Sequence, residues 1–403
     1  MRPVLFLDIS RLVRRAEHFG GPTGIDRVEL KWAEWLAAQD AFDGRAVTRA
    51  GPRLVSLTER SFHAVLATLD ARWRRGRPLG FREGSPPAAA YRAFAGRLRR
   101  WKLLAGARPL DAGGRPNVTL NVGHDGLDVA ARFARLPGSF AALVHDLIPL
   151  AHPHYDTPRA TALHARRLAT LTELADHVFT PSEAVAADLR AHAPNARFTT
   201  SVLRFGPGLP RTSGTSGTSG TSGTSKVTFV HLSTIDRRKN LSLLLHLWRE
   251  LAAAPDPPLL LVIGRGGNDH TALDLIARAG GLGGVVATGP LGDEEVAARL
   301  AGARALLTPS FAEGYGLPIV EAHQMGVPVV ASDIPAHREV GGLGPTYLSP
   351  LDGLGWKAAI EALAGDGAHH AARVAAIPPP PRWDAMFTEA TQVLLTLSER
   401  APR

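Results

Sequence analysis

The chain has 403 residues, carries a formal net charge of +9 and contains no cysteine. This length exceeds what a single hydrophobic core usually organises, so we expect two domains. The absence of cysteine excludes disulfides, thiolate metal sites and cysteine nucleophiles, and it fits a reducing compartment. The 45% apolar and 21% charged residues are typical of a soluble globular protein, and no apolar run approaches the roughly 18 to 20 residues that span a bilayer.

The first half of the chain alternates short apolar stretches with amphipathic ones. Residues 4–9 are apolar, but the stretch is too short for a secretory signal and is interrupted by Asp8. It therefore predicts a buried strand and a cytoplasmic protein. Further strands are predicted at 118–122, 141–144 and 177–180, and helices at 25–38, 158–175 and 183–192.

A repeat of Thr, Ser and Gly separates the two halves. Residues 212–225 read TSGTSGTSGTSGTS and contain no apolar side chain, which predicts a flexible coil at or beside the interdomain connection. After the repeat, strands are predicted at 227–232, 259–264, 285–288, 305–308 and 329–331. Helices are predicted at 240–253, 271–279, 294–301 and 318–324, and again at 384–398.

The order of these elements predicts the fold class. Short, almost wholly apolar strands separated by amphipathic helices are typical of α/β domains whose parallel sheets are covered on both faces. We therefore expect two Rossmann-like domains. Parallel sheets bind ligands beyond the carboxyl ends of their strands, so the active site is expected in a cleft between the domains.

Residues 311–341, FAEGYGLPIVEAHQMGVPVVASDIPAHREVG, place Glu313 and Glu321 around a glycine-containing turn that leads into a helix. Pro318 suits the first helical position, which puts Glu321 in the first turn, and Gly326 suits a left-handed helix end. Free N–H groups at a helix N-terminus attract anions, so a diphosphate is expected over that turn. The turn consists of Gly314, Tyr315, Gly316 and Leu317. This segment therefore predicts a nucleotide-sugar pocket.

The words EGYGLPIVEA and GVPVVASDIPAHREV, with the glutamates eight positions apart, resemble the E-x7-E region of retaining glycosyltransferases of family 4. The resemblance implies the GT-B fold, in which two Rossmann-like domains face each other across a cleft. It assigns the ribose hydroxyls of the nucleotide to Glu321 and the transferred sugar to Glu313. It also implies an acceptor-binding domain at 1–205, a linker with the repeat at 206–226, a donor-binding domain at 227–382, and a C-terminal helix at 383–403 that packs back on the first domain.

Arg238 and Lys239 lie between a predicted strand and the helix at 240–253. Two cations at the carboxyl end of a strand can neutralise a departing diphosphate. The RKN word resembles the family 4 segment whose lysine contacts the β-phosphate, which assigns Lys239 to the leaving group with Arg238 beside it. No Asp-x-Asp pair occurs at a predicted strand end, and no His or carboxylate cluster has metal-ligand spacing. We therefore expect no metal and no cofactor beside the nucleoside diphosphate sugar.

The first domain contributes a glycine-rich turn and a histidine. In GGPTGIDRV, Gly21 and Gly24 lead into a helix whose first N–H groups, near Ile25, are expected to meet the donor phosphates. The HDLIP word resembles the family 4 segment whose histidine lies near the anomeric carbon. This resemblance assigns a catalytic role to His145, with Asp146 as its orienting neighbour. In the second domain, base contacts are expected from two turns, formed by Gly264, Arg265 and Gly266 and by Gly289, Pro290 and Leu291.

The positive charge is concentrated between Arg72 and Arg115, where twelve basic residues accompany two acidic ones and several aromatic ones. Such a stretch predicts contact with an anionic membrane surface or with an anionic lipid-linked acceptor, and a solvated helix face is the alternative. Nucleic acid is not an expected partner, because no zinc, helix-turn-helix or RNP pattern accompanies the charge.

Together these features predict a retaining, metal-independent glycosyltransferase at the cytoplasmic side of the membrane. It would move a hexose, with mannose as one option, from a nucleoside diphosphate sugar to a glycan or lipid-linked acceptor in surface polysaccharide synthesis. Two alternatives stay open. One is a non-catalytic partner that only binds nucleotide sugar, and the other is a phosphorylase or hydrolase on the same fold.

Overall fold

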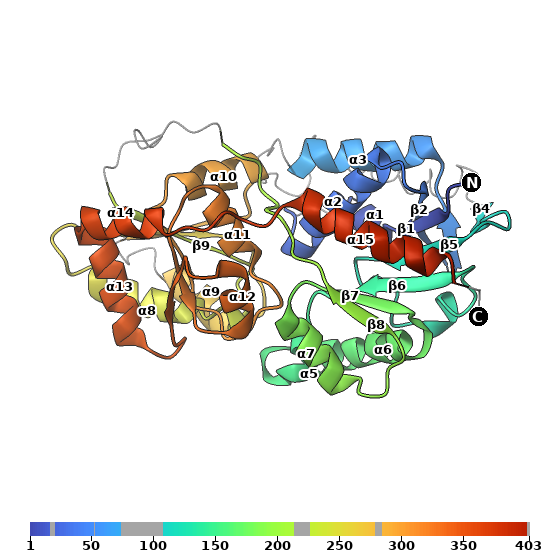
Figure 1. The fold of residues 1–403 in the computed structure, drawn as a ribbon. Helices are drawn as coiled ribbons and strands as arrows, with labels where there is room; N and C mark the ends of the chain where they lie inside the picture. Colours follow the sequence, from blue (N-terminus) through green and yellow to red (C-terminus); the bar gives the residue numbers. More distant parts are fainter. Residues whose placement is uncertain (17–20, 52, 74–107, 213–225, 279–283, 401–403) are drawn as a thin grey trace, which may run out of the picture. The chain divides into compact units, whose positions relative to one another are not determined.

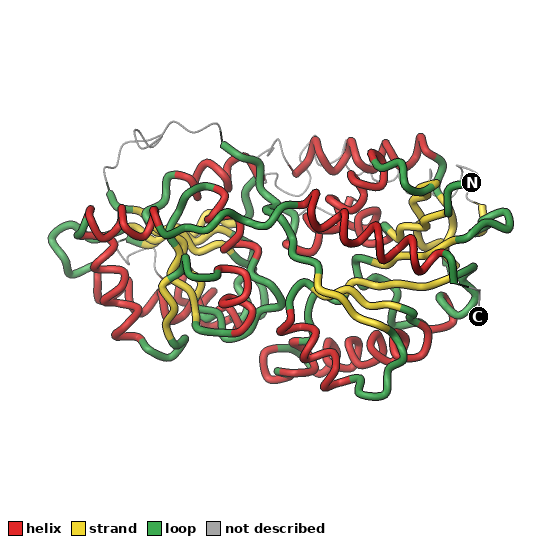
Figure 2. The backbone as a smooth tube through the Cα atoms, viewed as in Figure 1, coloured by secondary structure: helices red, strands yellow, loops and turns green. Residues whose placement is uncertain are grey.

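The structure, a computed structural model, describes residues 1–16, 21–51, 53–73, 108–212, 226–278 and 284–400. The described chain divides into two compact units. Unit 1 runs to Phe205 and resumes at Arg382, and unit 2 runs from Gly206 to Pro381. Each unit is a sheet with helices packed around it (Figures 1 and 2). Most of the predicted linker repeat and of the basic segment lies outside the described residues.

Unit 1 is built on an eight-stranded sheet in the order β4-β3-β2-β1-β5-β6-β7-β8. Neighbours from β2 to β8 are parallel, whereas β3 runs antiparallel to both β2 and β4. The prediction of a wholly parallel sheet is wrong at this edge, because a tight turn at Gly51 (φ +60°) reverses the chain between β2 and β3. The strands are β1 (Val4–Asp8), β2 (Asp43–Ala50), β3 (Arg53–Ser56), β4 (Arg108–Pro109), β5 (Asn117–Asn121), β6 (Ser139–Leu143), β7 (His177–Thr180) and β8 (Thr199–Val202).

Helices α2, α6 and α7 of unit 1 lie within one residue of their predicted bounds. Their N-caps are Thr23, Thr157 and Ser182, whose hydroxyls accept a first-turn N–H as helix starts require. The described helices are α1 (Ser10–Ala16), α2 (Gly24–Ala38), α3 (Glu59–Trp73), α5 (Ile148–Ala151), α6 (Pro158–Leu174), α7 (Glu183–His192) and α15 (Trp383–Ser398), with the short 3-10 helices η1 (Ala130–Arg132) and η2 (Pro153–Tyr155).

The last helix, α15, is part of unit 1. A row of stacked rings fixes its first turns: Phe205 lies 5.8 Å from Trp383, and Phe387 lies 5.1 Å from Trp35 of α2, centroid to centroid. Its last turn meets the sheet, where the Ser139 hydroxyl donates to the carbonyl of Leu397 at 2.7 Å. The aromatic row therefore ties the point where the chain leaves unit 1 to the point where it returns.

Unit 2 contains a six-stranded, wholly parallel sheet in the order β11-β10-β9-β12-β13-β14, as the apolar strands predicted. Its core includes the fully buried Trp248 and Trp356, which pack with leucines of α8 and the central strands. The strands are β9 (Thr228–Leu232), β10 (Leu259–Ile263), β11 (Val285–Gly289), β12 (Ala305–Thr308), β13 (Val329–Ser332) and β14 (Thr346–Leu348).

The four helices predicted in unit 2, α8 to α11, lie within two residues of their predicted bounds, whereas α12, α13 and α14 were not predicted. The exact start of α11 matters for the site. This helix begins at Leu317, so Pro318 is its second residue and Glu321 lies beyond the first turn, which corrects the predicted placement. Gly326 has φ +69°, which confirms the left-handed helix end. The described helices are η3 (Arg237–Lys239), α8 (Leu241–Leu251), α9 (His270–Arg278), α10 (Asp293–Ala301), α11 (Leu317–Gln324), α12 (Pro335–Gly341), α13 (Gly353–Gly365) and α14 (Gly367–Ala375).

No described helix is both long and apolar enough to cross a membrane. Nor do three or more histidine or carboxylate side chains in the described ranges come together as ligands for a metal ion.

Candidate functional site

The carboxyl ends of the parallel strands of unit 2 bring most predicted donor residues to one edge of the sheet. Arg238 and Lys239 form η3 after β9, and Gly264 follows β10. Gly289 ends β11, and Glu313 lies in the loop between β12 and α11. Residues far apart in the sequence therefore meet at the edge where parallel sheets bind ligands.

The carboxylate of Glu313 is the centre of a compact charged cluster. Nη1 of Arg238 lies 2.7 Å from Oε2, and Nζ of Lys239 donates to Oε1. The Ser310 hydroxyl also donates to Oε1, at 2.8 Å, and Arg238 reaches the carbonyl of Ala312 at 3.0 Å. The Glu313 side chain is only 9% exposed. One carboxylate thus holds both cations that the sequence assigned to the diphosphate.

The charges in this cluster are strongly coupled. Burial alone would raise the pKa of Glu313, but the positive charges of Lys239 and Arg238 outweigh it and hold that pKa well below its usual range. Burial and the neighbouring Arg238 lower the pKa of Lys239, and Glu313 opposes that shift. With all three groups ionised, two cations face one carboxylate, and the charge of Asp236 also acts on Lys239.

Asn240 explains why the sequence brings η3 against the loop after β12. It adopts a left-handed conformation (φ +54°), which asparagine tolerates better than most residues, and so lets the chain turn from η3 into α8. Its amide donates to the carbonyls of Pro309 and Pro350 at 3.2 and 2.9 Å. In addition, the N–H of Phe311 donates to the carbonyl of Arg238 at 2.7 Å. The two cations are therefore positioned by the backbone.

The turn before α11 has the glycine-dependent geometry that the sequence indicated. Gly316 is the N-cap residue with φ +113°, and no described side chain caps this helix. Its carbonyl accepts the N–H of Ile319 at 2.9 Å. Gly314 and Tyr315 are buried beside it, whereas Leu317 is half-buried. Glu321, one turn further on, is 1% exposed and lies outside the Glu313 cluster among the described contacts.

Sequence reasoning missed two residues that support this site. Ser310 binds Glu313 directly, as described above. His337 is fully buried behind the turn, where a Cβ added to Gly316 would lie 3.3 Å from its ring. Its Nδ1 lies 3.1 Å from the carbonyl of Ser332, and burial lowers its pKa to about 4 although Glu313 opposes that shift. His337 stands in the IPAHREV word, but neither its residue type nor its spacing indicated this position.

The turns predicted to contact the base lie at the same edge. The N–H of Gly264 donates to the carbonyl of Gly289 at 3.1 Å, which joins the ends of β10 and β11. Arg265 is exposed, and its carbonyl accepts the N–H of Ile235. Leu291 is half-buried just before α10. Contact of these residues with a base stays a prediction.

In unit 1, His145 follows β6 at the carboxyl edge of the sheet and is 7% exposed. Its Nε2 lies 2.7 Å from the carbonyl of Val122, and its backbone N–H donates to Nε2 of His124 at 3.1 Å. Burial lowers the pKa of His145 to about 4, so the ring is neutral at pH 7. The charge of Asp146 acts on this ring and opposes the lowering of its pKa, while its carboxylate accepts the N–H of Ile148 at 3.2 Å. Its role as the orienting neighbour of His145 stays a prediction.

The glycine-rich turn of unit 1 also differs from the prediction. Gly24 begins α2, but the N–H groups near Ile25 are not simply open. The N–H of Asp26 donates to the Thr23 hydroxyl in a capping box. The Asp26 carboxylate, in turn, binds two arginines that reach it from α1 and the N–H of Thr23. Gly21 gives its carbonyl to one of them, Arg15. Donor contacts of Gly21 and Gly24 stay a prediction, but a phosphate there would also meet the negative charge of Asp26.

One turn further along α2, Glu29 makes unit 1 sensitive to pH. The side chain is fully buried, and burial raises its pKa well above the usual range although Arg11, 3.9 Å away, opposes the shift. Because the pKa of Glu29 is raised in the folded state, the contribution of this residue to the free energy of unfolding is complete below the pKa that glutamate has in the unfolded chain. That contribution is lost as the pH rises.

We therefore expect Glu29→Gln to change the pH dependence of unfolding. Between pH 5 and pH 8 the wild type should lose stability relative to the variant, by at most about 1.4 kcal/mol per pH unit, because glutamine does not titrate. Thermal unfolding midpoints at pH 5, 6.5 and 8 measure the difference. Glu34→Gln, on the same helix but less buried, is the control. Parallel curves for wild type and Glu29→Gln would contradict the burial of a titrating carboxyl.

Comparison with known proteins finds a family match in unit 2. Residues 219–346 match the family described as Glycosyl transferases group 1. Unit 2 contains a glycosyl transferases group 1 domain. Over 125 residues the chain is 35% identical to the O-antigen chain mannosyltransferase B of Escherichia coli, covering 30% of this chain and 33% of that protein. Over 235 residues it is 28% identical to the serotype-specific mannosyltransferase WbdA of Escherichia coli, covering 53% and 28%. The chain thus spans about a third or less of the curated relatives it matches.

A solved structure has the same fold over almost the whole length of the chain. The crystal structure of Anabaena HepE in complex with UDP-glucose superposes with a TM-score of 0.63 at 17% identity, covering 98% of this chain and 100% of that one. This likeness confirms the predicted GT-B fold class. The glycosyl transferases group 1 domain includes the Glu313 cluster and α11.

Proposed function

We propose that the protein is a retaining, metal-independent glycosyltransferase that moves a hexose from a nucleoside diphosphate sugar to a glycan or lipid-linked acceptor. The observation that carries this proposal is the bridge from Glu313 to Arg238 and Lys239, within a glycosyl transferases group 1 domain. Fixed cations that are already desolvated and oriented are suited to stabilise the charge that develops on a departing diphosphate.

In the proposed reaction, cations and backbone amides stabilise the leaving phosphate, and carboxylates bind the two sugar rings. As the bond between the anomeric carbon and the phosphate oxygen breaks, Lys239, Arg238 and the amides at the tip of α11 take up the negative charge on the phosphate. The acceptor oxygen bonds to the anomeric carbon on the same face and gives its proton to the leaving phosphate, so configuration is retained. Glu313 would give up part of its contact with the two cations and would bind the hexose instead. Glu321 would bind the ribose.

His145 contributes as a neutral hydrogen-bonding group in this scheme. With its pKa lowered to about 4 and its Nε2 donating to Val122, its Nδ1 is an acceptor for a sugar hydroxyl. Mannose is our first choice of hexose, because the relatives named above are O-antigen and serotype-specific mannosyltransferases. By the same similarity we place the reaction in surface polysaccharide synthesis at the cytoplasmic face of the membrane, with the basic segment at 72–115 as the membrane contact.

Donor binding tests the proposal. In a thermal-shift screen across UDP, GDP, ADP and their sugars, we expect one nucleotide to raise the unfolding midpoint, since a ligand at 100 times its Kd adds about 2.7 kcal/mol. Glu321→Ala should lose most of that shift, because it removes the carboxylate assigned to the ribose. Glu361→Ala, an exposed acid on α13, is the matched control and should keep it. If no nucleotide moves the wild-type midpoint, the proposed donor site is wrong.

A further inference from the structure

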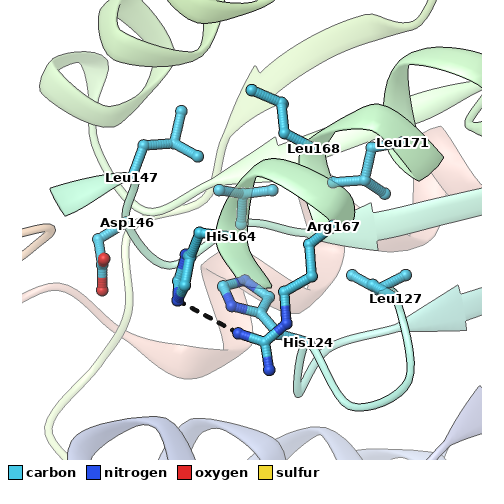
Figure 3. A pocket seen from close by; sticks show the side chains of 9 residues that line it. His124, Leu127, Asp146, Leu147, His164, Arg167, Leu168 and Leu171 are labelled. Atoms are coloured by element: carbon cyan, nitrogen blue, oxygen red, sulfur yellow. Dashed lines mark hydrogen bonds between the residues drawn. The ribbon is translucent and has the colours of Figure 1, made fainter. Parts of the chain in front are cut away.

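A pocket in unit 1 lies beneath α6, beside the carboxyl ends of β5 and β6 (Figure 3). Leucines from α6 and from the loops after these strands form its apolar wall. Its polar lining consists of His124, Asp146, His164 and Arg167, and Figure 3 shows the two rings and the guanidinium converging. Of these four residues, only Asp146 had been given a role from the sequence.

The hydrogen bonds of the two imidazoles fix Nδ1 as the donor atom of each ring. Nε2 of His124 accepts the backbone N–H of His145, so the proton of this neutral ring is on Nδ1. Nη1 of Arg167 can only donate, and it lies 3.2 Å from Nε2 of His164, so the proton of that ring is on Nδ1 as well. Burial lowers the pKa of both rings, which keeps them neutral at pH 7.

Arg167 supplies the positive charge of the pocket lining. Its Nε is buried and has no hydrogen-bond acceptor, and no described carboxylate lies within ion-pair distance of its guanidinium. Asp128 and Asp125 attract its charge from outside ion-pair distance, and their attraction is opposed by Arg11 and Arg14. A half-buried arginine without a carboxylate partner needs an acceptor from elsewhere.

The backbone beside the pocket is strained. His124 has φ +58°, a left-handed conformation that is unfavourable for residues other than glycine. The Asn121 side chain holds it there by accepting the N–H of His124 at 3.0 Å. Strain of this kind persists where the surrounding structure over-determines it, and here it directs the His124 ring into the pocket.

We propose that this pocket binds an oxyanion, a phosphate or carboxylate group carried by the acceptor, with Arg167, His164 and His124 as its donors. The assignment to the acceptor rests on the proposed function, whereas the oxyanion site itself does not. The polar lining offers three donor groups and one acceptor, the carboxylate of Asp146 at the rim. Such a set of donors suits a ligand whose oxygens are negatively charged. The space beneath α6 is small, so one oxygen of such a group would enter it and the rest of the group would stay at the rim.

The test uses the full chain with histidine labelled by nitrogen-15 and inorganic phosphate as the probe. Phosphate added at constant ionic strength should shift the ring signals of His124 and His164 to saturation in the millimolar range. Arg167→Ala should weaken this binding by about tenfold or more, while Arg166→Ala, an exposed arginine on the same helix, should leave it unchanged. Methyl mannoside, which is neutral, should not produce the shift. Mannose 1-phosphate and inorganic phosphate, compared at equal concentration, separate a carried phosphate from the free ion.

The variant Asp146→Asn tests whether the ligand is an anion. If the ligand is an anion, removal of the rim carboxylate should tighten phosphate binding, whereas a neutral hydroxyl ligand would lose an acceptor and bind more weakly. The proposal is overturned if phosphate leaves both ring signals unmoved, if Arg167→Ala binds as well as Arg166→Ala, or if methyl mannoside competes. Donor binding, measured by the nucleotide screen, is independent of Arg167, so failure of the oxyanion site and failure of the proposed function can be told apart.

Discussion

Glu313→Gln is expected to lower turnover by about 100-fold or more and to lower the free energy of unfolding of unit 2 by about 3 kcal/mol. Glutamine keeps the shape of the side chain but removes the negative charge between Arg238 and Lys239. Breaking a buried ion pair by removing one partner typically costs about 3 to 5 kcal/mol, because the other charges are left uncompensated. The cations would also move apart, and misplacement by about 1 Å in an active site can cost about 100-fold in rate.

Chemical denaturation and steady-state transfer assays measure these two effects. Glu250→Gln is the matched control, because Glu250 pairs with Lys357 on the surface of the same unit and should change neither quantity measurably. The pH dependence gives a second check. Glu313 has a depressed pKa, so its contribution is present above the unfolded-state value near 4.5 and is lost as the pH falls below it. The stability difference between wild type and variant should therefore shrink below about pH 4.5, and a constant difference would argue against the ion pair.

Gly264→Ala should unfold or strongly destabilise unit 2, by about 4 kcal/mol or more. Gly264 has φ +149°, a conformation that is nearly restricted to glycine, and a Cβ added there would lie 1.7 Å from the carbonyl oxygen of Ser233. No side-chain rotation relieves a contact with a backbone atom, so β9 and β10 would have to separate. Losses of this size are exceptional for single substitutions and indicate a specific steric cause.

Gly289→Ala separates the effect of space from that of conformation. Gly289 also has a positive φ, +71°, but a Cβ there would meet no atom within 4 Å. It should cost only about 1 kcal/mol, the penalty for alanine in a left-handed conformation. Soluble yield and the midpoint of urea unfolding compare the two variants. Equal destabilisation would show that the contact with Ser233 is not responsible.

The sequence predicted those parts of the fold that local patterns determine. Apolar strands such as 177–180 and 305–308, and helices with an N-cap such as Ser182, have the predicted bounds within a residue. Five strands were missed, since they are partly exposed and lack a continuous apolar run: β2, β3, β4, β8 and β14. The pairing of β2 with β3 depends on a turn rather than on the hydrophobic pattern.

For the site, spacing and residue type located the components but not their partners. The motif around Glu313 and the Arg238–Lys239 pair were found, yet the bridge between them joins residues about 75 positions apart and is a property of the folded sheet edge. The same limitation applies to His124, which no motif singled out. Its position follows from a left-handed backbone conformation that a histidine in the sequence does not reveal.

The aromatic row at Phe205, Trp383, Phe387 and Trp35 bears on how the two units can be separated. Among the described residues, all of unit 2 lies between Gly206 and Pro381, so it can be exchanged as a cassette between residues 205 and 382. Unit 1, in contrast, is completed only by the last helix. A fragment that stops at Phe205 would leave Trp35 and the amino end of β6 at Ser139 without their covering helix. Exchange of the two units at that single point would therefore produce an incomplete unit 1.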